Sequence, residues 1–286
     1  MKKLRLNPGV AFALPALVVL ALLIVYPLIY TIIMSFQTRT GGWAGLANYE
    51  RILPARVTLI ALKNTFVYVF WSIVFQVGIG TAAGILLDQR FAGRATARSV
   101  LLIPWVIPGI VAATTWAWMF HSEFGIINYM LVEFGIIDQP VNWLSNIDTV
   151  LPALIAINVW KMFPFVAIMV LAGLQSVDKS LYEAARVDGA SFADEVRFIM
   201  IPQLRPVLAA VTLLLVIWGL NGITIIYSIT QGGPANRSLI TPIQIYQTAF
   251  ETFRLNDAAA LSVAFFIFVS MLAGLYIYLT QRGELD

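Results

Sequence analysis

The sequence predicts an all-α, polytopic membrane protein, and three observations lead to this prediction. Of its 286 residues, 60% are hydrophobic and 12% are charged, and the mean hydropathy is +0.84. A soluble domain carries about a quarter charged residues, so ordinary soluble enzymes and nucleic-acid-binding proteins are excluded. The chain has no cysteine and one histidine, His121, which leaves few groups for a disulfide framework, a metal site or nucleophilic catalysis. Six stretches reach the about 20 apolar residues that a membrane span needs: about 9–36, 65–87, 99–120, 150–174, 206–230 and 257–280.

The first stretch resembles a secretory signal peptide at its start, because Lys2, Lys3 and Arg5 precede it. It is longer than the roughly 7–15 residues of a signal-peptide apolar region, and the residues that follow offer no small-residue cleavage site. We therefore expect it to be retained as a span.

The orientation follows from the Lys and Arg residues of the short loops, which favour the cytoplasmic side. With the N-terminus inside, the cytoplasmic side has Lys2, Lys3, Arg5, Arg90, Arg94, Arg98, Lys179, Arg186, Arg197, Arg205 and Arg282. The outer side has Arg39, Arg51, Arg56, Lys63, Arg237 and Arg254, and Lys161 lies inside a span. This distribution predicts that both termini are cytoplasmic.

The outer segments carry patterns of their own. Residues 121–149 contain four acidic residues and no Lys or Arg, and place Ile126, Met130 and Phe134 at helical spacing. This spacing predicts a short helix along the membrane surface, although a solvated loop is the alternative. Residues 37–63, in contrast, carry more Lys and Arg than Asp and Glu.

The longest inner segment, about 175–205, predicts two short helices joined at a glycine. Ser180 and Glu183 have the spacing of a capping box, so a helix is expected to begin there, and Gly189 suits its left-handed end. Ser191 and Asp194 predict the start of the second helix. From local features alone, this loop is equally an interfacial hairpin packed on its own bundle.

After this loop, Pro202 and Pro206 predict a break in the chain before the fifth span, because proline lacks an amide hydrogen.

The same loop resembles the EAA loop of ABC importer membrane subunits. The matching residues are Glu183-Ala184-Ala185, Asp188-Gly189-Ala190, Ile199 and Ile201-Pro202, with Ile201 where the family often has leucine. The resemblance implies that Glu183, Ala184, Ala185, Asp188 and Gly189 form a coupling helix. In that family this helix docks in a groove of the ATP-hydrolysing subunit.

Other segments resemble the carbohydrate-uptake branch of these permeases, in the first-partner type of the maltose and glycerol-phosphate systems. They are Tyr26-Pro27, Gly45-Leu46-Ala47-Asn48-Tyr49, Pro104-Trp105-Val106-Ile107-Pro108, Trp143-Leu144, Trp160-Lys161-Met162-Phe163-Pro164, Gly232-Gly233-Pro234, Ile245-Tyr246 and Ala249-Phe250. The resemblance implies that residues 1–286 form one six-span transmembrane domain in the inner membrane of a prokaryote. It implies three kinds of partner: a second homologous permease subunit, two copies of an ATPase subunit and an extracytoplasmic solute-binding protein. ATP and Mg would be bound by the ATPase, with no cofactor on this chain.

The groups that the sequence lacks favour the same interpretation. No Gly-Lys dipeptide occurs, so there is no phosphate-binding Walker loop, and no Asp or Glu lies mid-span to couple transport to an ion. A stand-alone secondary carrier or channel remains the main alternative. An intramembrane hydrolase would need a nucleophile and base that the chain does not show, and a non-transporting structural subunit is a further possibility.

Polar and aromatic residues at membrane depth are candidates for the solute pathway, because they are costly unless they face the bundle interior. The candidates are Trp105, Gly109, Asn158, Lys161, Met162, Trp218, Gly219, Asn221 and Gly222. Such a mixture of aromatic, amide and small residues suits a sugar, either a neutral oligosaccharide or an anionic derivative. The structural alternative for Lys161 is snorkelling or bonding to carbonyls near Pro164, and each aromatic residue alone could pack between helices or face lipid.

Overall fold

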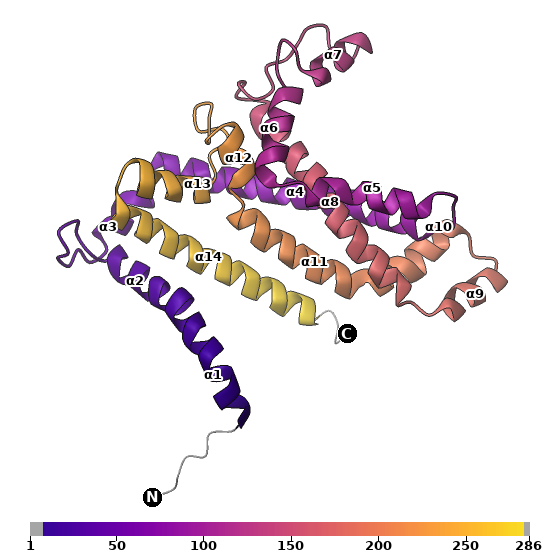
Figure 1. The fold of residues 1–286 in the computed structure, drawn as a ribbon, viewed down its shortest axis with the longest axis horizontal. Helices are drawn as coiled ribbons and strands as arrows, with labels where there is room; N and C mark the ends of the chain where they lie inside the picture. The colour runs from indigo at the N-terminus through magenta and orange to yellow at the C-terminus, as the bar shows by residue number, and fades with distance from the viewer. Residues whose placement is uncertain (1–7, 283–286) are drawn as a thin grey trace, which may run out of the picture. The chain divides into compact units, whose positions relative to one another are not determined.

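The computed structural model describes residues 8–282, which form helices joined by loops (Figure 1). Within that range the helices are α1 Pro8–Leu20, α2 Tyr26–Ser35, α3 Ala47–Ile52, α4 Arg56–Asp88, α5 Arg94–Val106, α6 Gly109–Met119, α7 Ile126–Glu133, α8 Val150–Gln175, α9 Lys179–Val187, α10 Phe192–Asp194, α11 Ile201–Asn221, α12 Thr224–Ile229, α13 Thr241–Tyr246 and α14 Leu255–Arg282. Three π-helical segments join some of them, at Ala21–Val25, Glu195–Met200 and Gln247–Glu251. The basic residues Lys2, Lys3 and Arg5 lie outside the described residues.

Among the described residues, five helical stretches are long and apolar enough to cross a membrane: Phe12–Ser35, Arg56–Asp88, Val150–Gln175, Phe192–Ile229 and Leu255–Leu279. The pair α5 and α6 passes the same criterion when it is taken as one broken span. Each of the six predicted stretches falls on one of these. The helices that contain the second and fifth stretches begin before residues 65 and 206, at Arg56 and Ile201.

The third predicted span is bent by 94° between α5 and α6. Pro108 disfavours a helical conformation at the residue before it, and Ile107 is extended, with φ −57° and ψ 130°. The bend therefore exposes the last carbonyls of α5 and the first amides of α6.

The predicted break at Pro202 and Pro206 is wrong. Pro202 lies in the first turn of α11 and Pro206 lies inside it, and helix continues through both. The π-helical segment Glu195–Met200 comes directly before Pro202. We attribute the tolerance to this wider turn, because an i→i+5 pattern relieves the need for an amide at the proline.

The chain divides into two compact units. Unit 1 contains the described residues up to Thr58 together with Gln244–Phe268, and unit 2 contains Leu59–Ile243 together with the described residues from Val269.

In unit 2, helices α4, α8 and α11 pack around one apolar core. Its buried members are Ile85, Val166, Val170, Leu174, Met200, Leu204, Val211 and Leu215. Gly80 and Gly84 of α4 face α8 so closely that a Cβ on Gly84 would lie 2.7 Å from the carbonyl oxygen of Ala167. This close approach is typical of the small-xxx-small pattern between membrane helices.

In unit 1, side chains of α3 and α14 bind the end of α2. Asn48 Nδ2 donates to the carbonyls of Ser35 and Gln37, at 2.8 and 2.9 Å, and Asn256 Nδ2 donates to that of Met34 at 3.0 Å. The buried carboxylate of Asp257 lies 3.2 Å from Arg51 Nε and 2.6 Å from Arg254 Nη2. These contacts satisfy helix-end carbonyls and hold the loop segments of the unit together.

The loop between α6 and α8 contains the short helix that was predicted there, α7 Ile126–Glu133. Buried Asn128 organises the loop: its Nδ2 donates to the carbonyl of Val141, and its Oδ1 accepts from Trp143 Nε1 at 2.8 Å. Ile126, Met130 and Phe134 are exposed.

Candidate functional site

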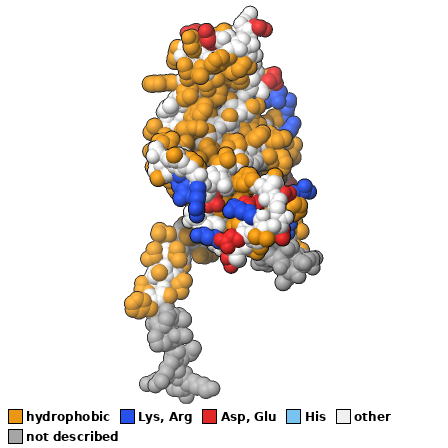
Figure 2. All heavy atoms as spheres, turned by 90° about the vertical axis from the view of Figure 1, so that its right-hand side faces the viewer, with side chains coloured by type: hydrophobic (Ala, Val, Ile, Leu, Met, Phe, Trp, Pro, Cys, Tyr) orange, Lys and Arg blue, Asp and Glu red, His pale blue; other side chains and the backbone are white. Residues whose placement is uncertain are grey.

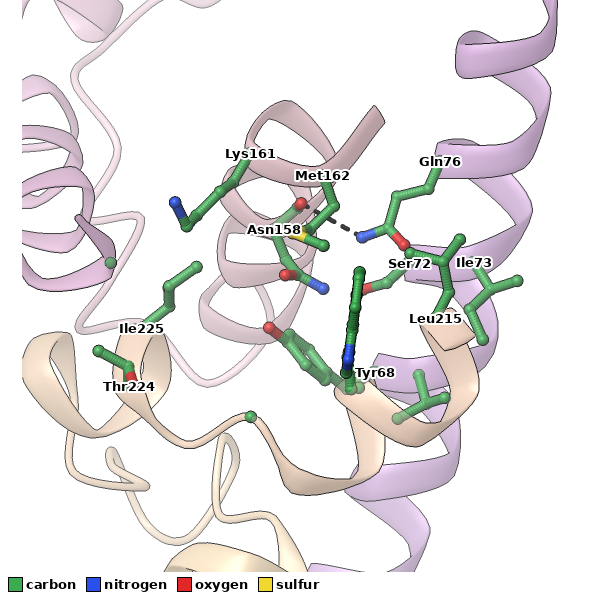
Figure 3. A pocket seen from close by; sticks show the side chains of 15 residues that line it. Tyr68, Ser72, Ile73, Gln76, Asn158, Lys161, Met162, Leu215, Thr224 and Ile225 are labelled. Carbon is green, nitrogen blue, oxygen red and sulfur yellow. Dashed lines mark hydrogen bonds between the residues drawn. The ribbon is translucent and has the colours of Figure 1, made fainter. Parts of the chain in front are cut away.

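A polar cavity of about 330 Å³ lies in unit 2 between α4, α8, the end of α11 and α12 (Figure 3). Its walls combine amides, hydroxyls, an ammonium group, aromatic rings and glycines. The lining residues are Tyr68, Val69, Ser72, Ile73, Gln76, Gly109, Asn158, Lys161, Met162, Leu215, Trp218, Gly219, Gly222, Thr224 and Ile225.

One wall is a polar stripe on α4, made by Tyr68, Ser72 and Gln76. Each is at most 3% exposed, and their spacing of four residues places them on one helical face. Gln76 Nε2 donates to the carbonyl of Asn158 at 3.2 Å, whereas Ser72 Oγ is buried without a hydrogen-bond partner. The stripe was not predicted, although three polar residues at i, i+4 and i+8 in an apolar span are the signal that identifies it.

The opposite wall comes from α8, where Asn158 and Lys161 lie one turn apart. In Figure 3 the Asn158 amide lies on the side facing Tyr68 and Ser72. Lys161 Nζ donates to the carbonyl of Ile107 at 2.5 Å and lies 3.5 Å from those of Pro104 and Trp105. Its partners are therefore the free carbonyls at the end of α5, and the alternative of carbonyls near Pro164 is wrong.

Glycines bring the remaining elements close to the cavity. A Cβ on Gly109 would lie 3.2 Å from Thr224 Cγ2, and one on Gly219 would lie 3.3 Å from Val69 Cγ2. Larger residues would push α6 from α12 or α11 from α4. The glycines thus set the size of the cavity.

Most of the predicted pathway residues line this cavity. Those that do are Gly109, Asn158, Lys161, Met162, Trp218, Gly219 and Gly222. Trp105 does not; it stacks on Phe165 with the ring centres 5.8 Å apart. Asn221 is exposed, and its amide donates to the carbonyl of Ile217 in its own helix.

The loop after α8 forms helix α9, which contains Glu183, Ala184 and Ala185. Asp188 follows as its C-terminal cap, and Gly189 has φ +83°, which fits the predicted left-handed end. Glu183 and Ala184 are exposed, and so is Val187, at 88%. Val187 adds an exposed apolar side chain that the motif does not include.

The helix begins earlier than predicted. Asp178, not Ser180, is the N-terminal cap: its carboxylate accepts from Ser180 N at 2.9 Å. This hydrogen bond holds the pKa of Asp178 below its usual value. The predicted Ser180–Glu183 capping box is therefore wrong.

The second capping box, of Ser191 and Asp194, is present with both of its hydrogen bonds. It begins the long helical run through α10 and α11, so no separate second short helix forms.

Two contacts tie α9 to the bundle. Arg186 donates to both carboxylate oxygens of Glu195, at 2.7 and 3.3 Å, and Glu195 is only 4% exposed. This hydrogen bond raises the pKa of Arg186. Tyr182 packs on the core of α4, α8 and α11. These contacts join α9 to the ends of α4, α8 and α11 on its side of the bundle.

Among the described residues, no group of three or more His, Cys, Asp or Glu side chains could hold a metal ion.

Comparison with known proteins places the chain in a transporter family. Residues 76–282 match the family described as binding-protein-dependent transport system inner membrane component. The trehalose/maltose transport system permease protein MalF of Thermococcus litoralis is 34% identical over 269 residues, which cover 91% of this chain and 89% of the relative. The sulfoquinovosyl glycerol transport system permease protein SmoG of Agrobacterium fabrum is 30% identical over 276 residues, covering 94% and 89%.

A solved structure has the same fold. A chain of a bacterial alginate ABC transporter, in complex with an alginate pentasaccharide-bound periplasmic protein, superposes with a TM-score of 0.86. The alignment covers 95% of this chain and 93% of that one, at 20% identity. Together with the matched family, these likenesses show that the chain belongs to the binding-protein-dependent ABC transporter permeases.

Proposed function

We propose that this permease moves a sugar or sugar-like solute into the cell through the unit 2 cavity, driven by ATP that a separate subunit hydrolyses. The observation that carries the proposal is the set of uncharged polar groups in the cavity, on Tyr68, Ser72, Gln76 and Asn158, beside the ring of Trp218. Amides and hydroxyls bind sugar hydroxyls, and an aromatic face packs on a sugar ring.

One charged group lines the cavity, and part of its charge is balanced within the protein. Lys161 is the charged side chain among the residues that line it, and its ammonium group is directed at three backbone carbonyls. Its charge is therefore partly balanced by the negative end of α5. An anionic sugar would have to compete with that balance.

The names of similar proteins support the substrate class and the partners. The relatives include a trehalose/maltose and a sulfoquinovosyl glycerol permease, and the similar structure contains a periplasmic binding protein. We propose the corresponding assembly here: a second permease subunit, two ATPase subunits that hold ATP and Mg, and an extracytoplasmic binding protein.

Within this assembly, α9 is the proposed contact with the ATPase, through Glu183, Ala184, Ala185, Asp188 and Gly189. Ala184 is exposed and small, so the backbone of the ATPase subunit can approach the helix closely there. The exposed side chain of Val187 adds an apolar contact. This placement requires both chain termini to be cytoplasmic.

The test compares two asparagines of the same membrane region in the assembled transporter. Asn158→Ala removes an amide from the cavity, and we expect sugar uptake at low concentration to fall about tenfold, the value of one lost hydrogen bond of about 1.4 kcal/mol. Asn221→Ala is the matched control, because its amide bonds within its own helix. Equal uptake by both variants would argue against the cavity as the pathway.

The stand-alone carrier or channel makes a different prediction. Vesicles that contain this chain without an ATPase subunit would then take up the sugar, whereas the proposed importer requires the ATPase and ATP. Uptake without them would overturn the proposed energy source.

A further inference from the structure

A second polar cavity, of about 740 Å³, lies in unit 2 at the end formed by loops that the sequence predicts to be cytoplasmic. The turn between α4 and α5, the end of α8, helix α9 and the π-helical segment after α10 surround it. Figure 2 faces this end of the unit and shows Lys and Arg side chains gathered there with Asp and Glu. Its lining shares no residue with the cavity of the proposed transport pathway.

The lining has more positive than negative charge. The basic residues are Arg90, Arg94, Arg98, Lys179 and Arg186, and the acidic ones are Asp88, Glu183 and Glu195. Within the described part of the chain, Arg186 is the one of these five bases with a carboxylate oxygen within 4.0 Å, that of Glu195. The surplus therefore lies on the α4–α5 side, at Arg90, Arg94 and Arg98.

The backbone of α4 holds two of these arginines in place. Arg98 Nη2 donates to the carbonyl of Leu87 at 2.9 Å, and Arg94 Nη1 lies 3.4 Å from that of Asp88. Because these are the last carbonyls of α4, both guanidinium groups are fixed beside the cavity. Several of their N–H groups remain for a ligand.

Two buried polar groups at the cavity have no hydrogen-bond partner. They are Arg98 Nε and the hydroxyl of Tyr182. A buried donor without an acceptor is unfavourable, and few occur in folded proteins. Both groups can donate a hydrogen bond, and the excess of arginine beside them favours an anionic acceptor.

The position of the cavity indicates the source of the anion. It lies where the apolar spans α4 and α8 end, on the side that carries the basic loops, and the positive-inside rule assigns that side to the inner leaflet. Next to the arginines, α5 exposes Val100 and Ile103, at 56% and 52%. These side chains provide an apolar path for an acyl chain below the headgroup.

We propose that this cavity binds the phosphate group of an anionic phospholipid of the inner leaflet. The planar guanidinium groups of Arg94 and Arg98 match phosphate oxygens in geometry and charge, and Arg90 adds a further positive charge. Because Tyr182 and Arg186 belong to α9, a bound headgroup would brace this helix against the bundle. The site is independent of the identity of the transported solute.

The test measures the thermal stability of the full-length chain in lipid nanodiscs. Discs of phosphatidylcholine alone are compared with discs that also contain phosphatidylglycerol, and lipid retention is measured by native mass spectrometry. We expect the anionic lipid to raise the unfolding temperature and to be retained. Each arginine removed should weaken retention roughly fivefold.

The variants separate the site from general charge effects. Arg90→Gln with Arg94→Gln should remove most of the gain, and Tyr182→Phe should reduce it while leaving charge and core packing intact. Arg205→Gln is the matched control, because Arg205 is exposed in α11 and does not line the cavity. The proposal is overturned if Arg205→Gln also loses the rise in unfolding temperature given by the anionic lipid. It is overturned equally if the cavity variants keep that rise.

Two further arms identify the source of the phosphate. The same arginine-dependent gain from glycerol phosphate in phosphatidylcholine discs would support the phosphate site and assign it to a soluble ester. An arginine-dependent gain only after the ATPase subunit is added would show that the surface contacts that protein instead, and would refute the lipid site.

Discussion

The close contact between α4 and α8 can be tested with a single methyl group. A Cβ on Gly84 would lie 2.7 Å from the Ala167 carbonyl oxygen and 2.7 Å from Val170 Cγ1. Ordinary contact begins at 3.4 Å, so the deficit is 3.4 − 2.7 = 0.7 Å. The backbone oxygen of Ala167 cannot rotate away. Gly84→Ala therefore has to separate the two helices, and such overpacking costs about 1–3 kcal/mol.

Gly78 provides the matched control on the same helix. A Cβ there meets nothing within 4 Å, so Gly78→Ala adds the same methyl group without a clash. Both changes gain about 1 kcal/mol from the higher helix propensity of alanine, and this gain cancels when the two variants are compared. The difference between them therefore isolates the contact with α8.

The assay is thermal unfolding of the purified full-length chain in detergent, followed by tryptophan fluorescence. We expect Gly84→Ala to unfold at a lower temperature than Gly78→Ala, by roughly 2–4 °C for each kcal/mol. If Gly84→Ala is as stable as Gly78→Ala, the close approach of α4 to α8 is refuted.

Three further predictions concern charged side chains. Arg186→Glu should lower the sugar-stimulated ATPase activity of the assembled transporter, because it removes the ion pair with Glu195. Adding Glu195→Arg in the same chain restores an ion pair and should restore the activity. If the double variant stays inactive, the ion pair does not link α9 to the bundle. Lys161→Met should lower the free energy of unfolding by about 1–2 kcal/mol, because the Ile107 carbonyl loses its hydrogen-bond donor. Lys161→Arg keeps a donor and should retain most of the stability of the unchanged chain. A denaturation measurement on both variants checks this difference. The pKa of Asp178 is depressed in the folded chain, so its stabilisation is complete above the ordinary Asp pKa of about 3.9 and is lost as the pH falls through its lower folded value. Amide protection at the start of α9 should therefore fall below about pH 4, and Asp178→Asn should remove this pH dependence.

The sequence predicted the positions of the spans because membrane crossing depends on local hydropathy. It did not predict where α4 and α11 begin, since polar residues lie in their first turns: Arg56 in α4 and Gln203 in α11. Pro202 was misleading for a related reason: the local rule for proline assumes an α-helical turn before it, and this chain has a π-helical one.

The cavity was predicted in part. Glycines and amides at membrane depth identified its α8 and α11 walls, because such residues are unusual in lipid. The α4 wall was not predicted, although Tyr68, Ser72 and Gln76 repeat every four residues, which places them on one face of a helix. The partner of Lys161 could not be predicted, because its carbonyls lie 54 residues earlier in the chain and become free only through the bend at Pro108.

That bend also sets an order for the synthesis of the protein. Helices α5 and α6 have 13 and 11 residues, which at 1.5 Å per residue reach about 20 and 17 Å, so neither crosses a hydrocarbon core of about 30 Å alone. The group that caps the corner, Lys161, leaves the ribosome 54 residues after Ile107. Translation adds about 5–20 residues per second, so the carbonyls at the bend lack the Lys161 donor for roughly 3–10 seconds. The hydrogen bond that caps the bend can therefore form only after the next span has been translated.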